Sequence, residues 1–332
     1  MQLKNLTNTL ALILLPLLSF TGGYAPLQGA PSPGSSAGAA SPGEKPLTFL
    51  VISDWGRDGI NDTDKKTPGQ LSVARQLGIT AGNVGASFVV SCGDNFHGQG
   101  VSDPADPLWK VNFEQVYTAG SLKVPWYIAL GNHDYEGNVE AELAYASMSA
   151  RWIQPARYFA FTREVSGGNT VLFVVLDSSP FVREYLKDER DQHHVRGQNT
   201  ARQIQWCDSV LSHSQAKWKF AFFHHPAYSA GTKHGSTPEI QQALVPLFEK
   251  YHVDACFSGH DHDLQHSHPD GSTVEYFGTG GGSETRPSGH ADFTRYSAAS
   301  LGFGVVSVTG DAMRFRFVSD RGKVLYRFDI RK

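Results

Sequence analysis

Five short apolar runs in this chain each end in side chains of the kinds that bind metal ions. The polar residues at these five ends are Asp54; Asp94 and His97; Asn132 and His133; His224; and His260 and His262. One such cluster is typical of a turn or a helix cap. Five in succession predict that the ends of five buried strands meet at one site, where open α/β sheets bind their ligands.

The order of predicted elements favours an α/β fold. Apolar runs and helical spacing of apolar residues predict, in the first half, strands at 47–52, 88–91 and 124–130 and helices at 67–84, 108–117 and 139–152. The second half predicts a hairpin of 158–165 with 171–176, strands at 218–223 and 255–258, and helices at 200–214 and 238–251. Residues 177–199 are polar and irregular. Four or five further strands close the chain, the last at 324–330.

This alternation, followed by hairpin-like strands, predicts a four-layer α-β-β-α sandwich of two mixed sheets with helices outside. A single doubly wound sheet is the alternative.

The N-terminal segment has the composition of a secretory signal peptide. Lys4 precedes an apolar run at 10–20, and small residues follow at 23–25. The run is shorter than the ~20 apolar residues that span a bilayer, although an uncleaved anchor is the alternative. We therefore expect a signal peptide at 1–25, a Pro/Gly/Ser/Ala-rich linker at 26–46 and one catalytic domain at 47–332. The mature protein would be secreted or periplasmic, without a membrane span.

Charge and cysteine content exclude some classes of function. With 29 Lys and Arg against 32 Asp and Glu, the chain has a net charge of −3, which does not predict binding to bulk nucleic acid. Its cysteines are Cys92, Cys207 and Cys256. Three cysteines cannot form a complete disulfide framework, and none are paired at the spacing of a thiolate zinc site. We expect buried free thiols.

The side chains at the strand ends indicate the kind of metal. Carboxylates, imidazoles and one amide oxygen suit iron or borderline divalent ions better than Ca²⁺, which prefers oxygen ligands alone. His260 and His262 are alternate residues beyond a strand, so both rings can face one pocket. His193, His194 and His225 are interpreted as ordinary polar or core residues.

These motifs resemble those of a known family. Asp54-Trp55-Gly56, Gly93-Asp94, Gly131-Asn132-His133-Asp134, His224 ahead of Pro226, and Gly259-His260-Asp261-His262 are similar to the signature of the calcineurin-like metallophosphoesterases. Within that superfamily the chain most resembles the small, tartrate-resistant purple acid phosphatases, from residue 47 to its end. The resemblance implies the metallophosphoesterase fold, which is the sandwich predicted above.

The resemblance also implies site residues and cofactors. Two metal ions would share Asp94. The first would also bind Asp54, His262 and residue 97, and the second Asn132, His224 and His260. Iron with a second divalent ion (Fe, Zn or Mn) is implied. His133 and His234 match outer histidines that contact the phosphoryl oxygens or protonate the leaving alcohol.

Position 97 departs from the family pattern. Purple acid phosphatases have a Tyr ligand there, whereas this chain has His97. Imidazole suits these metals, so we expect His97 to act as the ligand in its place. The alternative is that the ligand is lost and the site weakened.

The implied activity is that of a secreted, acid phosphatase-like hydrolase with two metal ions. It would hydrolyse phosphate monoesters by attack of a metal-activated hydroxide. A phosphodiesterase or nucleotide pyrophosphatase on the same site, or a non-catalytic metal-binding surface protein, are the alternatives. Small phosphorylated substrates and a monomeric state are expected. We also expect the Gly-rich run at 278–284 and the loop to residue 296 to border the site.

Overall fold

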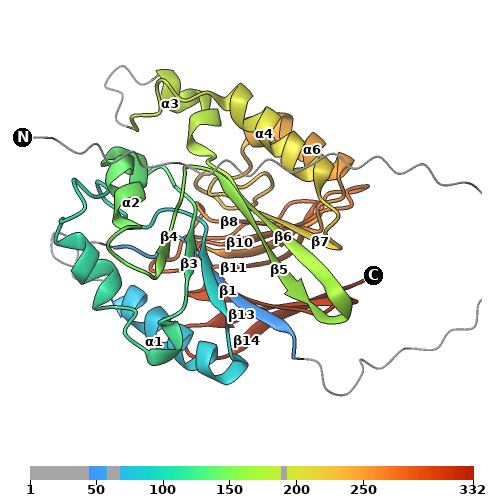
Figure 1. The fold of residues 1–332 in the computed structure, drawn as a ribbon, viewed down its shortest axis with the longest axis horizontal. Coiled ribbons are helices and arrows are strands. Elements are labelled where there is room, and N and C mark those ends of the chain that lie inside the picture. Colours follow the sequence, from blue (N-terminus) through green and yellow to red (C-terminus); the bar gives the residue numbers. More distant parts are fainter. Residues whose placement is uncertain (1–44, 58–67, 188–192) are drawn as a thin grey trace, which may run out of the picture. The chain divides into compact units, whose positions relative to one another are not determined.

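Two mixed sheets lie face to face in the computed structural model, which describes residues 45–57, 68–187 and 193–332 (Figure 1). The first sheet has the order β14-β13-β12-β1-β2-β3-β4. Its strands are β1 Leu47–Ile52, β2 Phe88–Ser91, β3 Trp126–Ile128, β4 Trp152–Ile153, β12 Gly302–Val308, β13 Ala312–Ser319 and β14 Val324–Arg331. The predicted signal peptide, and the predicted linker up to residue 44, lie outside the described residues.

The second sheet has the order β11-β9-β10-β8-β7-β6-β5. Its strands are β5 Phe159–Val165, β6 Asn169–Val175, β7 Trp218–Phe222, β8 Ala255–Ser258, β9 Leu264–Ser267, β10 Glu275–Thr279 and β11 Thr294–Ala298. β5 and β6 form the predicted antiparallel hairpin. Two sheets, each of seven strands, confirm the sandwich and exclude the single doubly wound sheet.

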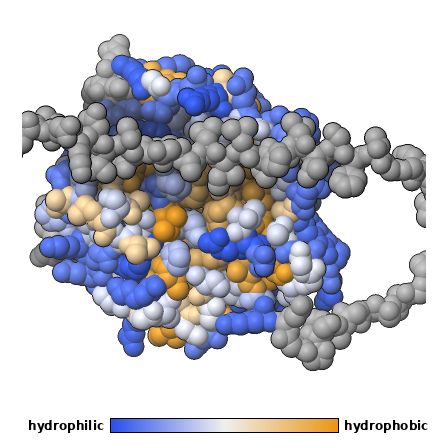
Figure 2. Space-filling model, in the orientation of Figure 1, coloured by the Kyte–Doolittle hydropathy of each residue, from blue (hydrophilic) through white to orange (hydrophobic). Residues whose placement is uncertain are grey.

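Helices cover the outer faces of both sheets. The helices are α1 Pro68–Val84, α2 Val139–Tyr145, α3 Arg183–Lys187, α4 Thr200–His213, α5 Pro238–Ala243 and α6 Val245–Lys250. Figure 1 shows α1 and α2 on one side of the strands and α3, α4 and α6 on the other. None of the helices that the structure describes is long and apolar enough to cross a bilayer. On the face drawn in Figure 2, hydrophilic residues dominate the periphery, with smaller hydrophobic areas among them.

Alternation along the strands creates three hydrophobic layers. In β1, Phe49 and Val51 face the second sheet, whereas Leu50 and Ile52 face α1. A third cluster, which includes Leu172 and Phe248, lies between the second sheet and the helices outside it. Central strands such as β1, β2 and β8 are therefore buried on both faces, which explains why they read as continuous apolar runs. The edge strand β14 instead alternates between partly buried and exposed residues.

Some predicted elements differ from the structure. The predicted helix at 139–152 ends at Tyr145, because Trp152 pairs with Trp126 of β3 and is fully buried. The predicted helix at 238–251 is interrupted at Leu244, since Pro246 cannot continue a preceding helix. The predicted helix at 108–117 is a short π-helical segment, Trp109–Glu114.

The predicted number of strands after β8 was also wrong. Six strands follow β8, where four or five were expected. The short strand β9 is fully buried but has the polar sequence Leu-Gln-His-Ser, which shows no apolar run.

Candidate metal centre

The carboxyl ends of five strands meet where the two sheets face each other. β1, β2 and β3 are parallel neighbours and carry Asp54, Asp94 and Asn132 just past their ends. β7 and β8 are parallel neighbours in the second sheet and carry His224 and the pair His260 and His262. The shared strand direction within each sheet therefore brings together the residues that the sequence predicted.

The backbone at these strand ends adopts an uncommon conformation. Asp54, Asp94, His260 and His262 have φ angles of 58°, 51°, 74° and 50°. The left-handed region costs a non-glycine residue on the order of 1–3 kcal/mol and concentrates at functional sites. The turns direct these four side chains into the centre instead of along the strands.

Asp134 joins two of the turns. Its buried carboxylate accepts hydrogen bonds from the backbone N–H groups of Asn95 (2.8 Å), Phe96 (3.0 Å) and Gly131 (2.8 Å). A side chain at Gly131 would not fit, because its Cβ would lie 2.2 Å from Oδ1 of Asp94. The Asp94 turn and the Asn132 turn are thus fixed against each other.

Potential ligand atoms gather around Asp94. Its Oδ2 lies 3.3 Å from Nε2 of His224, and Oδ1 of Asp54 lies 3.3 Å from Nε2 of His262. Nδ1 of His260 lies 3.2 Å from Nε2 of His224. Groups whose ligand atoms all lie within 4.8 Å of one another are Asp94, His97 and His262; Asp54, Asp94 and His224; and His224, His225 and His260.

Two buried oxygens of this cluster have no hydrogen-bond donor among the described residues. Oδ1 of Asp54 and Oδ1 of Asn132 accept no hydrogen bond although they are shielded from solvent. Buried polar atoms normally have a partner, and a cation would supply one here. With imidazoles and carboxylates at contact distance, this donor set fits iron or borderline divalent ions.

His97 belongs to this cluster. Its Nε2 lies 3.3 Å from Nε2 of His262 and 3.9 Å from Oδ2 of Asp94. Burial lowers the pKa of His97 to about 3. The neutral imidazole is the form that binds metals. The position is consistent with the expected ligand role.

His133 and His234 line one cavity of about 520 Å³ beside the cluster. Nδ1 of His133 lies 3.1 Å from Oε1 of Glu136. Although burial opposes it, the carboxylates of Asp94 and Glu136 raise the pKa of His133 to about 9. The ring of His234 lies 4.1 Å from that of His260. Burial, and then Arg286, lower the pKa of His234 to about 4.

The remaining histidines of interest have other partners. Both ring nitrogens of His225 are engaged, with the hydroxyls of Ser178 (2.9 Å) and Tyr185 (3.0 Å). This is consistent with an ordinary buried histidine, despite its proximity to the ligand atoms. His193 stacks on Tyr185 and lines the same cavity as His133 and His234. The polar sequence around His193 did not indicate this position. His194 is exposed and borders two neighbouring cavities.

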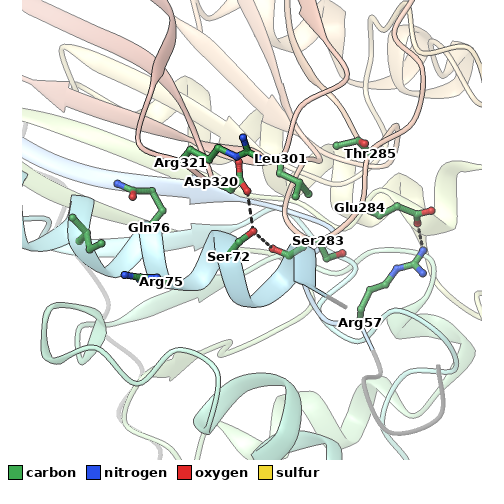
Figure 3. Close-up of a pocket in the computed structure, with 12 residues that line it drawn as sticks. Arg57, Ser72, Arg75, Gln76, Ser283, Glu284, Thr285, Leu301, Asp320 and Arg321 are labelled. Atoms are coloured by element: carbon green, nitrogen blue, oxygen red, sulfur yellow. Dashed lines mark hydrogen bonds and ion pairs between the residues drawn. The ribbon is translucent and has the colours of Figure 1, made fainter. Parts of the chain in front are cut away.

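Charged residues that the sequence analysis did not assign also surround the centre. Glu284, at the end of the Gly-rich run, lies 3.3 Å from Nδ1 of His262 and forms an ion pair with Arg57. Figure 3 shows this pair at one end of an adjacent cavity of about 900 Å³. Arg286 lines the cavity of His133 and His234. The expectation that the Gly-rich run borders the site is confirmed, although no sequence signal marked Glu284 or Arg286 individually.

The three cysteines are free and buried, as expected. Burial raises the pKa of Cys207 to about 12, so this thiol stays protonated and inert.

Comparisons with known sequences agree on one family of proteins. Residues 47–264 match the family of calcineurin-like phosphoesterases. The chain is 34% identical to purple acid phosphatase 4 of Arabidopsis thaliana, over 93% of this chain and 87% of that protein. It is 32% identical to tartrate-resistant acid phosphatase type 5 of Rattus norvegicus, over 85% of this chain and 89% of that protein.

Solved structures share the fold. GAP50, described as the anchor in the inner membrane complex of Plasmodium, superposes with a TM-score of 0.72 at 24% identity, covering 86% of this chain and 88% of that one. A purple acid phosphatase from yellow lupin seeds superposes with a TM-score of 0.63 at 16% identity, covering 87% of this chain and 54% of that one.

Proposed function

Because this chain belongs to the calcineurin-like phosphoesterase family, among the purple acid phosphatases, we propose that it is a secreted phosphatase that hydrolyses phosphate monoesters. The observation that carries the proposal is the convergence of carboxylate, amide and imidazole groups from five strand ends on one cluster beside a cavity, where two buried oxygens accept no hydrogen bond.

The residues divide into two roles. Asp54, Asp94, His97 and His262 would hold one ion, and Asp94 would share the second with Asn132, His224 and His260. When bound, two such ions supply a water that ionises near neutral pH and neutralise charge on the phosphoryl oxygens. Iron with a second divalent ion is the proposed pair. His133 and His234 reach the same cavity from outside the ligand set, where they can bind phosphoryl oxygens or give a proton to the leaving alcohol.

Further proposals concern the setting of the enzyme. The signal-like segment at 1–25 and the linker at 26–46 support a secreted or periplasmic location for the domain at 47–332. Small phosphorylated molecules fit a cavity of about 520 Å³. A monomer is the proposed state. A diesterase or pyrophosphatase activity and a non-catalytic role are the alternatives that the experiment below separates.

The test combines metal analysis with hydrolysis of p-nitrophenyl phosphate and bis(p-nitrophenyl) phosphate. We expect two metal ions per chain and faster turnover of the monoester. Asp94→Asn should lose metal and nearly all activity while circular dichroism shows a folded chain, because an amide cannot supply the shared negative charge. The control Asp311→Asn makes the same change at an exposed carboxylate paired with Lys217.

Each other result has a definite meaning. Faster turnover of the diester would replace the proposed substrate class, and a metal-loaded protein that hydrolyses neither ester would support the non-catalytic role. Full activity and two ions in Asp94→Asn would contradict the site itself.

A further inference from the structure

Arg286 is held against both loops that carry the second sheet's histidines. Its backbone N–H donates to the carbonyl of His262 at 2.9 Å. Its Nη1 lies 3.1 Å from Nε2 of His234 and 3.4 Å from the carbonyl oxygen of His260. These contacts fix a half-buried guanidinium in the wall of the cavity that Asp94, Asn132 and His133 also line.

This guanidinium has no carboxylate partner among the residues that the structure describes. Arg57, Arg151 and Arg157 each form an ion pair with a glutamate. Glu136, Glu184 and Glu239 line the same cavity as Arg286, but none forms an ion pair with it. A partly desolvated cation without a counter-ion is unfavourable unless an anion binds beside it. The cavity therefore offers an unused anion-binding group next to the metal ligands.

We propose that Arg286 binds a terminal oxygen of the substrate's phosphoryl group and thereby favours monoesters over diesters. This inference rests on the proposed function and extends it. A monoester near neutral pH carries two negative charges on three terminal oxygens, whereas a diester carries one charge on two. The additional oxygen and charge are the features that a guanidinium recognises, since its planar N–H groups match phosphate geometry. Arg286 is thus a substrate-binding residue that selects the phosphate class.

Arg286→Met removes the charge and keeps much of the volume, and Arg286→Lys keeps the charge without the planar fork. Calorimetric titration of each metal-loaded protein with inorganic phosphate measures anion binding directly. A lost charge-assisted hydrogen bond predicts phosphate binding about 10- to 100-fold weaker for Arg286→Met, with partial recovery in Arg286→Lys. kcat/KM should fall by a similar factor for p-nitrophenyl phosphate and by less for the diester.

A matched control is available in the adjacent cavity. Arg75 of α1 is exposed there and pairs with none of the described carboxylates (Figure 3). Arg75→Met removes the same charge outside the site, so phosphate binding should stay unchanged. Metal content should equal that of the wild type in all variants. An equal loss of phosphate affinity in Arg75→Met would mean that net charge alone is responsible, which would overturn the proposal.

The contact with His234 requires a second comparison. If Arg286 only positions that imidazole, Arg286→Met will have no further effect in a His234→Ala background. Direct binding predicts that the loss of phosphate affinity persists there. Unchanged phosphate affinity in Arg286→Met, or an equal loss of kcat/KM for both esters, would also overturn the inference. Phosphate titration does not require turnover. If the wild type hydrolyses neither ester, the proposed function is contradicted, but the titration still tests whether Arg286 binds phosphate.

Discussion

At the scale of single residues, position 97 changes the charge of the centre. Tyrosinate carries a negative charge, whereas the imidazole of His97 is neutral, and the cluster around it retains Asp54, Asp94 and His262. A neutral ligand removes part of the preference for a trivalent over a divalent ion. A divalent ion acidifies bound water less than a trivalent ion does. The site should therefore tolerate divalent metals and work nearer neutral pH than a site with tyrosinate at this position.

His97→Tyr tests this charge argument by absorption spectroscopy. The iron-loaded wild type should show no visible tyrosinate-to-iron band, because no phenolate is available at this position. The variant should gain such a band and move its activity optimum towards acid pH. A strong tyrosinate band in the wild type, or identical pH profiles for both proteins, would contradict the role given to His97.

His133→Ala should separate substrate chemistry from metal binding. A positioned acid–base group typically contributes ~10²–10⁴-fold to turnover, so kcat should fall by that order. Metal content, measured on the same preparation, should stay at the wild-type value because His133 lies outside the ligand set. His213→Ala, at an exposed position of α4, is the control. Loss of an ion from His133→Ala would show that this histidine is a ligand.

At the scale of elements, Asp177 connects β6 to the site. It lies just past the end of β6 and accepts a hydrogen bond from the hydroxyl of Tyr135, in the short helix after the Asn132 motif. Its backbone N–H donates to Oε1 of Gln203 in α4 at 2.8 Å. Burial raises the pKa of the Asp177 carboxyl to about 7, against the hydrogen bond from Tyr135 and the charge of Arg157.

This shift predicts a pH dependence of stability. Between pH 3.8, the ordinary pKa, and about 7, the folded protein keeps a proton that the unfolded chain has lost. The Asp177 contribution is thus fully present at low pH and decreases as pH rises, by at most about 1.4 kcal/mol per pH unit.

Asp177→Asn cannot ionise and should not show this decrease. The stability of the variant relative to the wild type should therefore be higher at pH 8 than at pH 5. Urea unfolding at several pH values measures the difference, with Asp311→Asn as the exposed control. Parallel pH profiles for wild type and Asp177→Asn would contradict the assigned shift.

At the scale of the whole molecule, the ligand set is divided between the two sheets. The proposed ligands Asp54, Asp94, His97 and Asn132 come from the first sheet, and His224, His260 and His262 come from the second. An aromatic core that includes Phe49 and Phe173 packs the sheets together. A bound ion would therefore link the two halves of the fold. Ions that bind only the folded arrangement stabilise it, by about 2.7 kcal/mol when present at 100 times their dissociation constant.

Removing the metals should lower the melting temperature. Calorimetric scans of the purified protein with and without EDTA measure the loss, and added metal should restore the original value. Asp94→Asn, which lacks the shared ligand, should melt near the temperature of the EDTA-treated wild type and respond little to EDTA. An unchanged melting temperature after verified metal loss would show that the ions do not link the sheets.

The sandwich and the candidate ligands could be predicted from local sequence patterns, because such patterns encode both. Buried strands read as apolar runs, and a polar residue such as Asn132 directly after a run must lie at the strand's end. The roles proposed for Asp54, Asp94 and the histidines followed from residue type and family resemblance, and their proximity was a consequence of parallel strands.

The residues that surround the candidate ligands could not be predicted in this way, because they are brought there by packing between distant segments. Glu136, Glu284 and Arg286 carry no signal of their own, since charged residues in loops are usually solvated. Contacts such as Glu284 with His262 and Arg286 with His234 join segments that come together only when the second sheet and its loops are packed. The same holds for Trp152, whose helical spacing was overridden by pairing with β3. Periodicity reports how an element is buried, whereas the identity of its neighbours depends on packing between distant segments.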